Sequence, residues 1–265
     1  MSRRLMLGSM EMPTFQTTWN IPSNGYTLVF PFTGNSPSDG DVIIDWGDGN
    51  KTTIPANGNV STYNSHQYTT AGNVEIKVMS KHGYMPRFSC LIISQSAPQL
   101  ITVDSPLLTI KSNETILTAL DNCFHSCTSL MRVSDKAFDN NTQVTTLYRC
   151  FYACLVLEEI PDGIFRYTIL STNFNTCFWN CRKLKINKNI FCDEPSEMLT
   201  RFAGLNVNFE SCFSRTSPQS TANGGTAPQL WNYAGTFTST SCFSGNGNNA
   251  NTLTNNGDIP TGWRS

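Results

Sequence analysis

The dipeptide Cys-Phe occurs five times in this chain, and its spacing constrains the fold more than any other feature. The first three pairs are 27 residues apart, and the next two intervals are 35 and 30 residues. The five cysteines are Cys123, Cys150, Cys177, Cys212 and Cys242. In the first three units a leucine follows seven residues later, at Leu130, Leu157 and Leu184. Agreement over consecutive units predicts a solenoid, whose repeats bury their apolar faces by stacking on one another.

Stacking places equivalent side chains of successive units in columns along the axis. One column holds the first cysteine of each unit, a second holds the phenylalanine, and a third holds a later cysteine. The predicted core residues of the repeats are Cys123, Phe124, Cys127, Cys150, Phe151, Cys154, Cys177, Phe178, Cys181, Cys212, Phe213, Cys242 and Phe243. A thiol behaves as a small apolar group and is often buried, so it fits beside phenylalanine in a narrow interior.

Zinc coordination and disulfide bonds are the alternative explanations for the repeated cysteines. Four thiolates from two units would suit tetrahedral zinc, but C-x3-C is at the loose end of the usual ligand spacing. The last two Cys-Phe units also lack the second cysteine. Disulfides would require an oxidising compartment. We favour buried thiols, and we predict neither a metal nor a cofactor.

The first ninety residues have the pattern of short β-strands. Residues 25–32, 41–46 and 73–80 are rich in β-branched and aromatic residues and are bounded by Gly, Pro and Asn. The stretch WGDGNKTTI contains an Asp-Gly pair, which supplies the positive-φ geometry that hairpin turns prefer. This pattern predicts a small antiparallel sandwich.

The stretch DWGDGNKTTI, followed by HQYTTAGNVEIKV, resembles the polycystic-kidney-disease (PKD) type of immunoglobulin-like domain. The residues that match the family pattern, in order within residues 14–85, are Trp46, Gly47, Asp48, Gly49, His66, Tyr68 and Gly72. The resemblance implies a spacer or binding module without catalysis, and we expect Trp46 in its core.

The repeat unit C-F-x2-C-x2-L-x2-[V/I] resembles the BspA-like leucine-rich repeats of bacterial surface proteins. The resemblance covers residues 88–263, and the stretch NGDIPTGW near the end resembles part of a degenerate last repeat and cap. The long insert between Cys181 and Cys212 departs from the family pattern. PKD-like modules also occur directly before such repeats.

We therefore expect a mainly β protein with short helical turns. Residues 1–13 form an N-terminal arm, residues 14–87 a PKD/Ig-like β-sandwich, and residues 88–265 a BspA-like leucine-rich-repeat solenoid with a C-terminal cap.

Composition and charge argue against several classes of partner. The net charge is −1, so no basic footprint points to nucleic acid, and no apolar run is long enough to span a bilayer. Charged residues make up 14% of the chain, well below the roughly 25% usual in soluble domains. The start, MSRRLMLGSMEMP, lacks the continuous apolar stretch of a signal peptide, so we expect no leader.

The search for catalytic chemistry finds no motif that carries it. The sequence contains no G-x-S-x-G, H-E-x-x-H or G-x4-G-K-[ST] pattern. A nucleophile pair of His125 with a repeat cysteine is an alternative, but the other units have Tyr152 and Trp179 at the same position. Asp45 and Asp48 could hold calcium, although a turn that needs Asp-Gly explains them too. We predict that the protein is not an enzyme.

Recognition is predicted on outward-facing repeat positions, because the inward ones are committed to packing. The candidate binding residues are Met131, Arg132, Tyr152, Glu158, Glu159, Trp179 and Lys185. Aromatic and arginine side chains are the usual anchors of interfaces. A solvated edge of mixed charge is the alternative explanation of the same row.

The combination favours a bacteriophage virion component, such as a capsid decoration, head fibre or tail fibre, because a virion protein leaves the cell by lysis without a leader. Its partners would be other virion proteins or a host surface receptor or glycan, and a homo-oligomer is an open alternative. The competing hypothesis is a bacterial cell-surface adhesin of the BspA-like type. A glycan-processing enzyme would need convergent carboxylates, which the sequence does not show.

Overall fold

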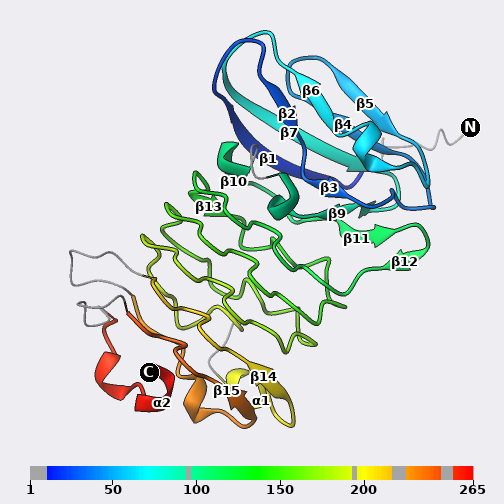
Figure 1. Cartoon of the computed structure of the whole chain (residues 1–265). Helices are drawn as coiled ribbons and strands as arrows, with labels where there is room; N and C mark the ends of the chain where they lie inside the picture. The colour runs from blue at the N-terminus through cyan, green and yellow to red at the C-terminus, as the bar shows by residue number, and fades with distance from the viewer. Residues whose placement is uncertain (1–10, 94–96, 193–195, 217–224, 246–252, 265) are drawn as a thin grey trace, which may run out of the picture.

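The computed structural model describes residues 11–93, 97–192, 196–216, 225–245 and 253–264. The chain is mainly β, with several sheets and few short helices (Figure 1). The helical elements are the 3-10 helices η1 (Val60–Thr62), η2 (Cys90–Ile93), η3 (Ala97–Gln99), η4 (Leu230–Asn232) and η5 (Asn256–Asp258), with α1 (Met198–Arg201) and α2 (Thr261–Arg264). Within the described residues, no helix has the length and apolarity that crossing a bilayer requires.

The largest sheet has six strands in the order β13-β10-β1-β7-β4-β5. These strands are β1 (Thr14–Ile21), β4 (Val42–Asp45), β5 (Lys51–Ile54), β7 (Gly72–Ser80), β10 (Leu100–Val103) and β13 (Arg132–Val133). Strand β1 alternates strictly, with Phe15, Thr17, Trp19 and Ile21 facing inward. The buried hydroxyl of Thr17 accepts a hydrogen bond from Trp19 Nε1 at 2.8 Å. This bond satisfies a polar group that would otherwise be costly to bury.

Smaller sheets complete this region. Strand β2 (Thr27–Val29) pairs with β6 (Ser65–Gln67), and β3 (Phe32–Thr33) pairs with β9 (Arg87–Phe88). The three-stranded sheet joins β8 (Tyr84–Met85), β11 (Thr109–Ser112) and β12 (Thr115–Ile116). The prediction of a single strand over residues 25–32 is therefore wrong, because this segment forms two short strands, β2 and β3. The strand is interrupted before β3 at Pro31, which lacks the N–H that a ladder needs.

Backbone pairing crosses the boundary predicted between residues 87 and 88. Strand β10 pairs antiparallel with β1, and β11 pairs in parallel with β8. Strand β13 then extends the same large sheet by pairing in parallel with β10. The β-rich N-terminal part and the following units are consequently joined through shared sheets (Figure 1).

The hairpin turn between β4 and β5 depends on Gly47. Its φ is +77°, and a Cβ there would lie 2.3 Å from the carbonyl oxygen of Glu75, so a side chain has neither the conformation nor the space. The Asp45 carboxylate accepts a hydrogen bond from Gly47 N at 3.1 Å. Trp46 is fully buried, and its carbonyl accepts the Tyr68 hydroxyl at 2.8 Å.

From residue 118 onward, successive chain turns stack in parallel. Isolated parallel bridges join Ala119, Thr146, Asn173 and Asn208 in one column. Strands β14 (Asn206–Asn208) and β15 (Thr236–Thr238) continue it with a parallel pair. In the first four Cys-Phe segments the phenylalanine N–H donates to the cysteine carbonyl of the next unit, at 2.7–2.8 Å.

The residue before the first cysteine of each unit has a left-handed backbone conformation. The φ values lie between +51° and +58° for Asn122, Arg149, Thr176, Ser211 and Ser241. This conformation is unusual for side chains other than Gly and Asn, and most of all for a β-branched one such as Thr176. The N–H groups of this segment point alternately in two directions. Those of Asn122, Phe124 and Ser126 donate to carbonyls of the next unit, whereas those of Cys123 and His125 donate within their own unit. The bonds to the next unit offset the strain.

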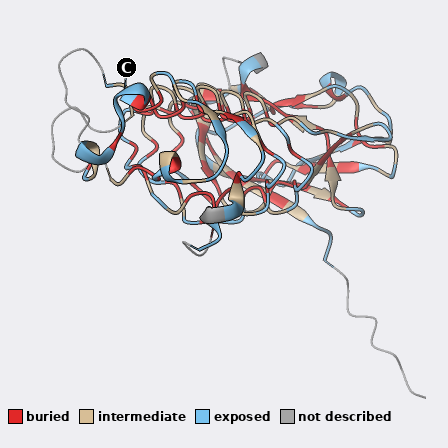
Figure 2. Cartoon of the chain, turned by 90° about the horizontal axis from the view of Figure 1, so that it is seen from below, coloured by how far each residue is buried: buried red, intermediate tan, exposed pale blue. Residues whose placement is uncertain are grey.

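A column of phenylalanine rings runs along the inside of the stack. Ring centroids are 5.1 Å apart from Phe124 to Phe151 and from Phe151 to Phe178, then 5.4 Å to Phe213 and 5.2 Å to Phe243. The spacing follows that of hydrogen-bonded strands, about 4.8 Å. Figure 2 shows the buried positions lining the interior of the stacked turns.

Both ends of the column are covered. Phe88 in β9 lies 5.7 Å from Phe124 and belongs equally to the aromatic core of the N-terminal part. At the other end, Trp263 of α2 lies 6.3 Å from Phe243, and its carbonyl accepts the Phe243 N–H at 2.8 Å. Capping of both termini is what a stack of repeats requires for stability.

The two cysteine columns flank the rings. All predicted core residues of the repeats are buried, with at most 2% of the surface of each exposed. The Cys154 thiol donates to the Phe124 carbonyl at 3.1 Å, and the Cys181 thiol donates to the Phe151 carbonyl at 3.0 Å. Burial raises the pKa of the Cys127, Cys150 and Cys154 thiols well above the ordinary value.

Replacing Phe151 by Ala should remove a ring from the middle of the column and leave a cavity. We expect a loss of about 3–5 kcal/mol in the free energy of unfolding, measured by urea titration. The control is Leu170→Ala, because Leu170 is 47% exposed and its truncation should change stability by less than about 0.5 kcal/mol. Equal losses of unfolding free energy in the two variants would contradict a stabilising role of the phenylalanine column.

The thiols should be inert in the folded protein. A raised pKa keeps a thiol protonated, and only the thiolate reacts, so labelling by a thiol reagent should be slow near neutral pH and faster as pH rises. Unfolded protein should release about ten titratable thiols, the number in the sequence. A melting temperature that falls sharply with a reductant or a chelator would contradict buried, metal-free thiols.

Candidate interaction surface

The structure separates the seven predicted binding residues into three groups. Tyr152 and Trp179 are half-buried and follow the core phenylalanine of their units. Met131 and Arg132 are exposed at strand β13, beside β10. Glu158, Glu159 and Lys185 are exposed on the second and third stacked units.

Tyr152 and Trp179 belong to a second, outer column of planar groups. Their ring centroids are 4.6 Å apart, with an interplanar angle of 14°. His125 stacks on the other face of Tyr152 at 4.7 Å and 5°. The guanidinium carbon of Arg215 lies 4.9 Å from the centroid of the Trp179 ring. We call His125, Tyr152, Trp179 and Arg215 the outer ladder.

The stacking of the units produces the outer ladder directly. The three rings occupy the same position in consecutive units, two residues after the first cysteine, and backbone bonds hold those units in register. Ser126 N donates to the Tyr152 carbonyl, and Ala153 N donates to the Trp179 carbonyl, both at 2.8 Å. Arg215 comes from one position later in its unit. Its longer side chain lets it cover the last ring from there.

Arginines give the outer ladder a positive character. The guanidinium carbon of Arg149 lies 4.8 Å from the ring centroid of Tyr148 and 5.2 Å from that of Tyr152. Its Nε is buried and has no hydrogen-bond partner among the described residues. None of the ion pairs between described residues includes Arg149 or Arg215. Burial and then the charge of Arg149 lower the pKa of His125, so this ring is neutral at neutral pH.

The nearby carboxylates are engaged elsewhere. Asp121 accepts hydrogen bonds from the Thr146 hydroxyl at 2.6 Å and from Tyr148 N at 3.1 Å. Glu210 accepts one from the Asn175 amide at 3.0 Å. Arg149 and Arg215 thus have no acidic partner among the described residues. Arg215 is exposed, so an incoming acceptor group could reach it.

The remaining predicted residues have other roles. Arg132 forms an ion pair with Asp104 at 2.9 Å, which ties β13 to the end of β10. Lys185 N donates to the Glu158 carbonyl at 2.9 Å, and the Glu159 and Lys185 backbones form a parallel bridge. Their side chains form no ion pair with one another. This part of the surface therefore remains available for other contacts.

The turn carboxylates of the N-terminal part are also committed to protein donors. Asp45 pairs with Lys51 at 2.9 Å, and this bond lowers the pKa of Asp45. Asp48 pairs with His66 at 2.7 Å. Burial opposes ionisation of Asp48, but hydrogen bonds from His66 and Asn50 hold its pKa below the usual value. Among the described residues, no three His, Cys, Asp or Glu side chains form a group suited to a metal ion.

Sequence reasoning missed Arg149 and Arg215 as members of the surface. Arg149 precedes a cysteine, and Arg215 is one position out of step with the rings, so the repeat alignment gives no signal for either. His125 was set aside because the sibling units lack a histidine. The relevant signal was that planar groups recur at this position, whatever their chemical type.

Comparisons with protein-family models, curated proteins and solved structures give no match to this chain.

Stacking in the outer ladder should couple Tyr152 to Trp179. A double-mutant cycle of Tyr152→Ala and Trp179→Ala should give a coupling energy of about 0.5–1.5 kcal/mol in urea unfolding. The comparison cycle pairs Trp179→Ala with Tyr167→Ala, because Tyr167 is a 50% exposed ring outside the ladder. That pair should be additive. Additivity in both cycles would contradict a ladder in solution.

Proposed function

We propose that this protein is a non-enzymatic structural and recognition component of a bacteriophage virion, acting as a capsid decoration, head fibre or tail fibre. In this proposal a PKD-type immunoglobulin-like module precedes a BspA-like leucine-rich solenoid. The buried Trp46 beside the Gly47 turn, and the parallel bridges between equivalent positions of successive units, support that assignment. Placement in a virion rests on the resemblance of the two modules to families used at surfaces.

The outer ladder is the observation that carries the recognition role. Tyrosine, tryptophan and arginine dominate the energetic centres of protein interfaces. Held in register by the stacked backbone, these side chains lose little conformational freedom when a partner binds, which lowers the cost of association. The stacked rings of the outer ladder cover one another's faces. A partner would therefore contact the ring edges and the guanidinium groups.

The charge of the ladder specifies the kind of partner. Arg149 and Arg215 have no acidic partner among the described residues, while Asp121 and Glu210 are occupied. A neighbouring subunit that presents carboxylates or other acceptors would complete these groups. Such complementarity contributes mainly to specificity and to the association rate.

Purified particles give the test of this proposal. Mass spectrometry should find the protein in wild-type virions, and the variant Tyr152→Ala/Trp179→Ala/Arg215→Ala should be incorporated poorly although it remains folded. A second variant, Glu158→Lys/Glu159→Lys with Trp179→Ala, tests the exposed acidic positions of the second unit. The control, Tyr167→Ala/Leu170→Ala, truncates exposed side chains outside the ladder and should be incorporated normally.

Two results would contradict the proposal in different ways. Absence of the protein from particles would remove the virion placement and leave a cell-surface role. Normal incorporation and normal host binding by both ladder variants would exclude this surface as the contact.

A further inference from the structure

A polar cleft crosses the stack where the third unit meets the segment beginning at Gly225. It consists of a pocket of about 320 Å³ and an adjoining one of about 270 Å³. Lys188 and Thr226 line both pockets, so the two adjoin. Together they fall in the size range of small-molecule sites, roughly 300–1,000 Å³.

Two largely buried aliphatic side chains contribute apolar surface to the cleft. Ile160 and Ile186 line it, and the backbone of Gly225 bridges to Ile186 in parallel. Thr226 N donates to the Ile186 carbonyl at 2.8 Å. A Cβ at Gly225 would lie 2.0 Å from that same oxygen, so only glycine allows the two backbones to approach this closely.

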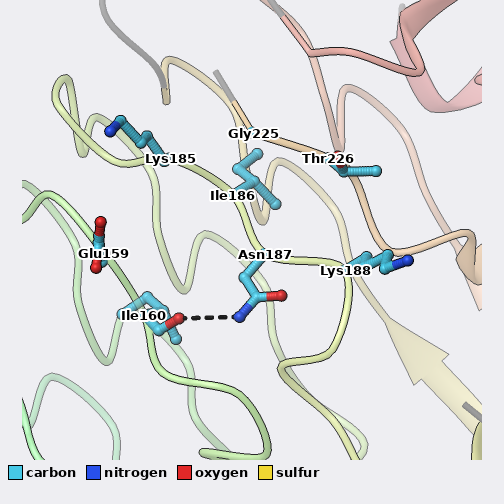
Figure 3. A pocket seen from close by; sticks show the side chains of 8 residues that line it. All are labelled: Glu159, Ile160, Lys185, Ile186, Asn187, Lys188, Gly225 and Thr226. Carbon is cyan, nitrogen blue, oxygen red and sulfur yellow. Dashed lines mark hydrogen bonds between the residues drawn. The ribbon is translucent and has the colours of Figure 1, made fainter. Parts of the chain in front are cut away.

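Hydrogen bonds fix the polar walls. The Asn187 amide donates to the Ile160 carbonyl at 3.3 Å (Figure 3) and also to Asp162. The Thr226 and Thr254 hydroxyls are bonded at 2.7 Å. In the adjoining pocket, Asn255 accepts from Ala227 N at 3.0 Å and donates to the Ala227 carbonyl at 3.1 Å. The cleft is therefore largely formed before any ligand binds.

The polar groups that are not used by the walls are the ones available to a ligand. Among the described residues, no hydrogen bond or ion pair engages the side-chain charges of Glu159, Lys185 and Lys188 or the hydroxyl of Tyr233. Figure 3 shows the Lys185 and Lys188 side chains extending to opposite sides of Ile186. Burial raises the pKa of Tyr233, so its hydroxyl remains a donor. The cleft thus presents two ammonium groups, one carboxylate and one phenol around this apolar surface.

Positive charge in the cleft comes from Lys185 and Lys188, which line it together with a single carboxylate, Glu159. The two ammonium groups favour an anionic ligand. Glu159, however, would repel a ligand made only of negative charges. It favours a ligand whose anionic group is accompanied by hydroxyls, which can donate to a carboxylate.

We infer that the cleft binds an acidic oligosaccharide, a sugar chain bearing carboxylate, sulfate or phosphate groups. Lys185 and Lys188 receive the anionic substituents, Glu159 accepts ring hydroxyls, and the sugar rings lie over Ile160, Ile186 and Gly225. The inference rests on the proposed recognition function and assigns it a ligand class. It uses a surface other than the outer ladder.

Calorimetric titration of the full chain tests the inference. The probes are a hyaluronan tetrasaccharide for carboxylate, a chondroitin sulfate tetrasaccharide for sulfate, and a phosphorylated mannose oligosaccharide for phosphate. Neutral cellotetraose and a poly-glutamate peptide are the comparison ligands. At least one acidic sugar chain should bind and lose about tenfold in affinity with Lys188→Gln and with Lys185→Gln, as expected for a lost charged hydrogen bond.

Matched variants separate the cleft from general attraction of anions. Lys183→Gln removes an exposed cation of the same unit that does not line the cleft, and it should leave affinity unchanged. Gly225→Ala should abolish binding, and its circular dichroism spectrum checks that it folds. If it does not fold, the lysine variants decide the outcome.

Several results would overturn the inference. These are no binding by any acidic sugar, equal binding of cellotetraose, binding of poly-glutamate at least as tight, or an equal loss with Lys183→Gln. Trp179→Ala should bind the sugar normally. Loss of particle incorporation with normal sugar binding would count against the proposed virion contact alone. Normal incorporation without sugar binding would count against the sugar site alone.

Discussion

The stacked phenylalanine column is the interaction on which the rest of the structure depends. From Phe88 to Trp263 the aromatic contacts continue without a break, so the N-terminal sheets and the C-terminal cap belong to one core. The phenylalanine rings are 5.1–5.4 Å apart, which is close to the roughly 4.8 Å between hydrogen-bonded strands. The backbone hydrogen bonds and the ring stacking therefore favour the same position of each unit on its neighbour. Both interactions fix the register between units.

The cysteines make this arrangement possible because they are small. A narrow turn that already contains a phenylalanine has room for a thiol on either side, and the thiols of Cys154 and Cys181 donate to backbone carbonyls of the previous unit. A serine could donate in the same way, but its hydroxyl is costlier to bury. A larger apolar residue would push the units apart. The repeated Cys-Phe pair is thus a packing solution in which the sulfur also supplies a weak hydrogen bond.

The sequence predicted the interior of the stack better than its edges. The 27-residue spacing was sufficient to identify the buried columns, since equivalent positions must meet equivalent neighbours. Strand β1 was missed because Thr17 faces inward, and its polarity hides the alternation. The Arg132–Asp104 ion pair and the shared sheet of β1 and β10 involve partners far apart in the chain, which no local pattern reveals. The cleft was missed for a related reason, since Gly225 follows the irregular insert and has no counterpart in the earlier units.

The hydrogen bonds between Cys-Phe segments all point the same way, which gives the stack a polarity. N–H groups of one unit meet carbonyls of the following unit, and the carbonyls of the first unit are covered by the N–H of Cys90. The two ends are therefore chemically different, whereas the middle Cys-Phe segments donate and accept through the same backbone groups. Duplication of one such unit would lengthen the protein by about 5 Å, the ring spacing, and leave both caps untouched. The fold is in this sense an adjustable spacer, in which length can change by gene duplication while the terminal surfaces stay the same.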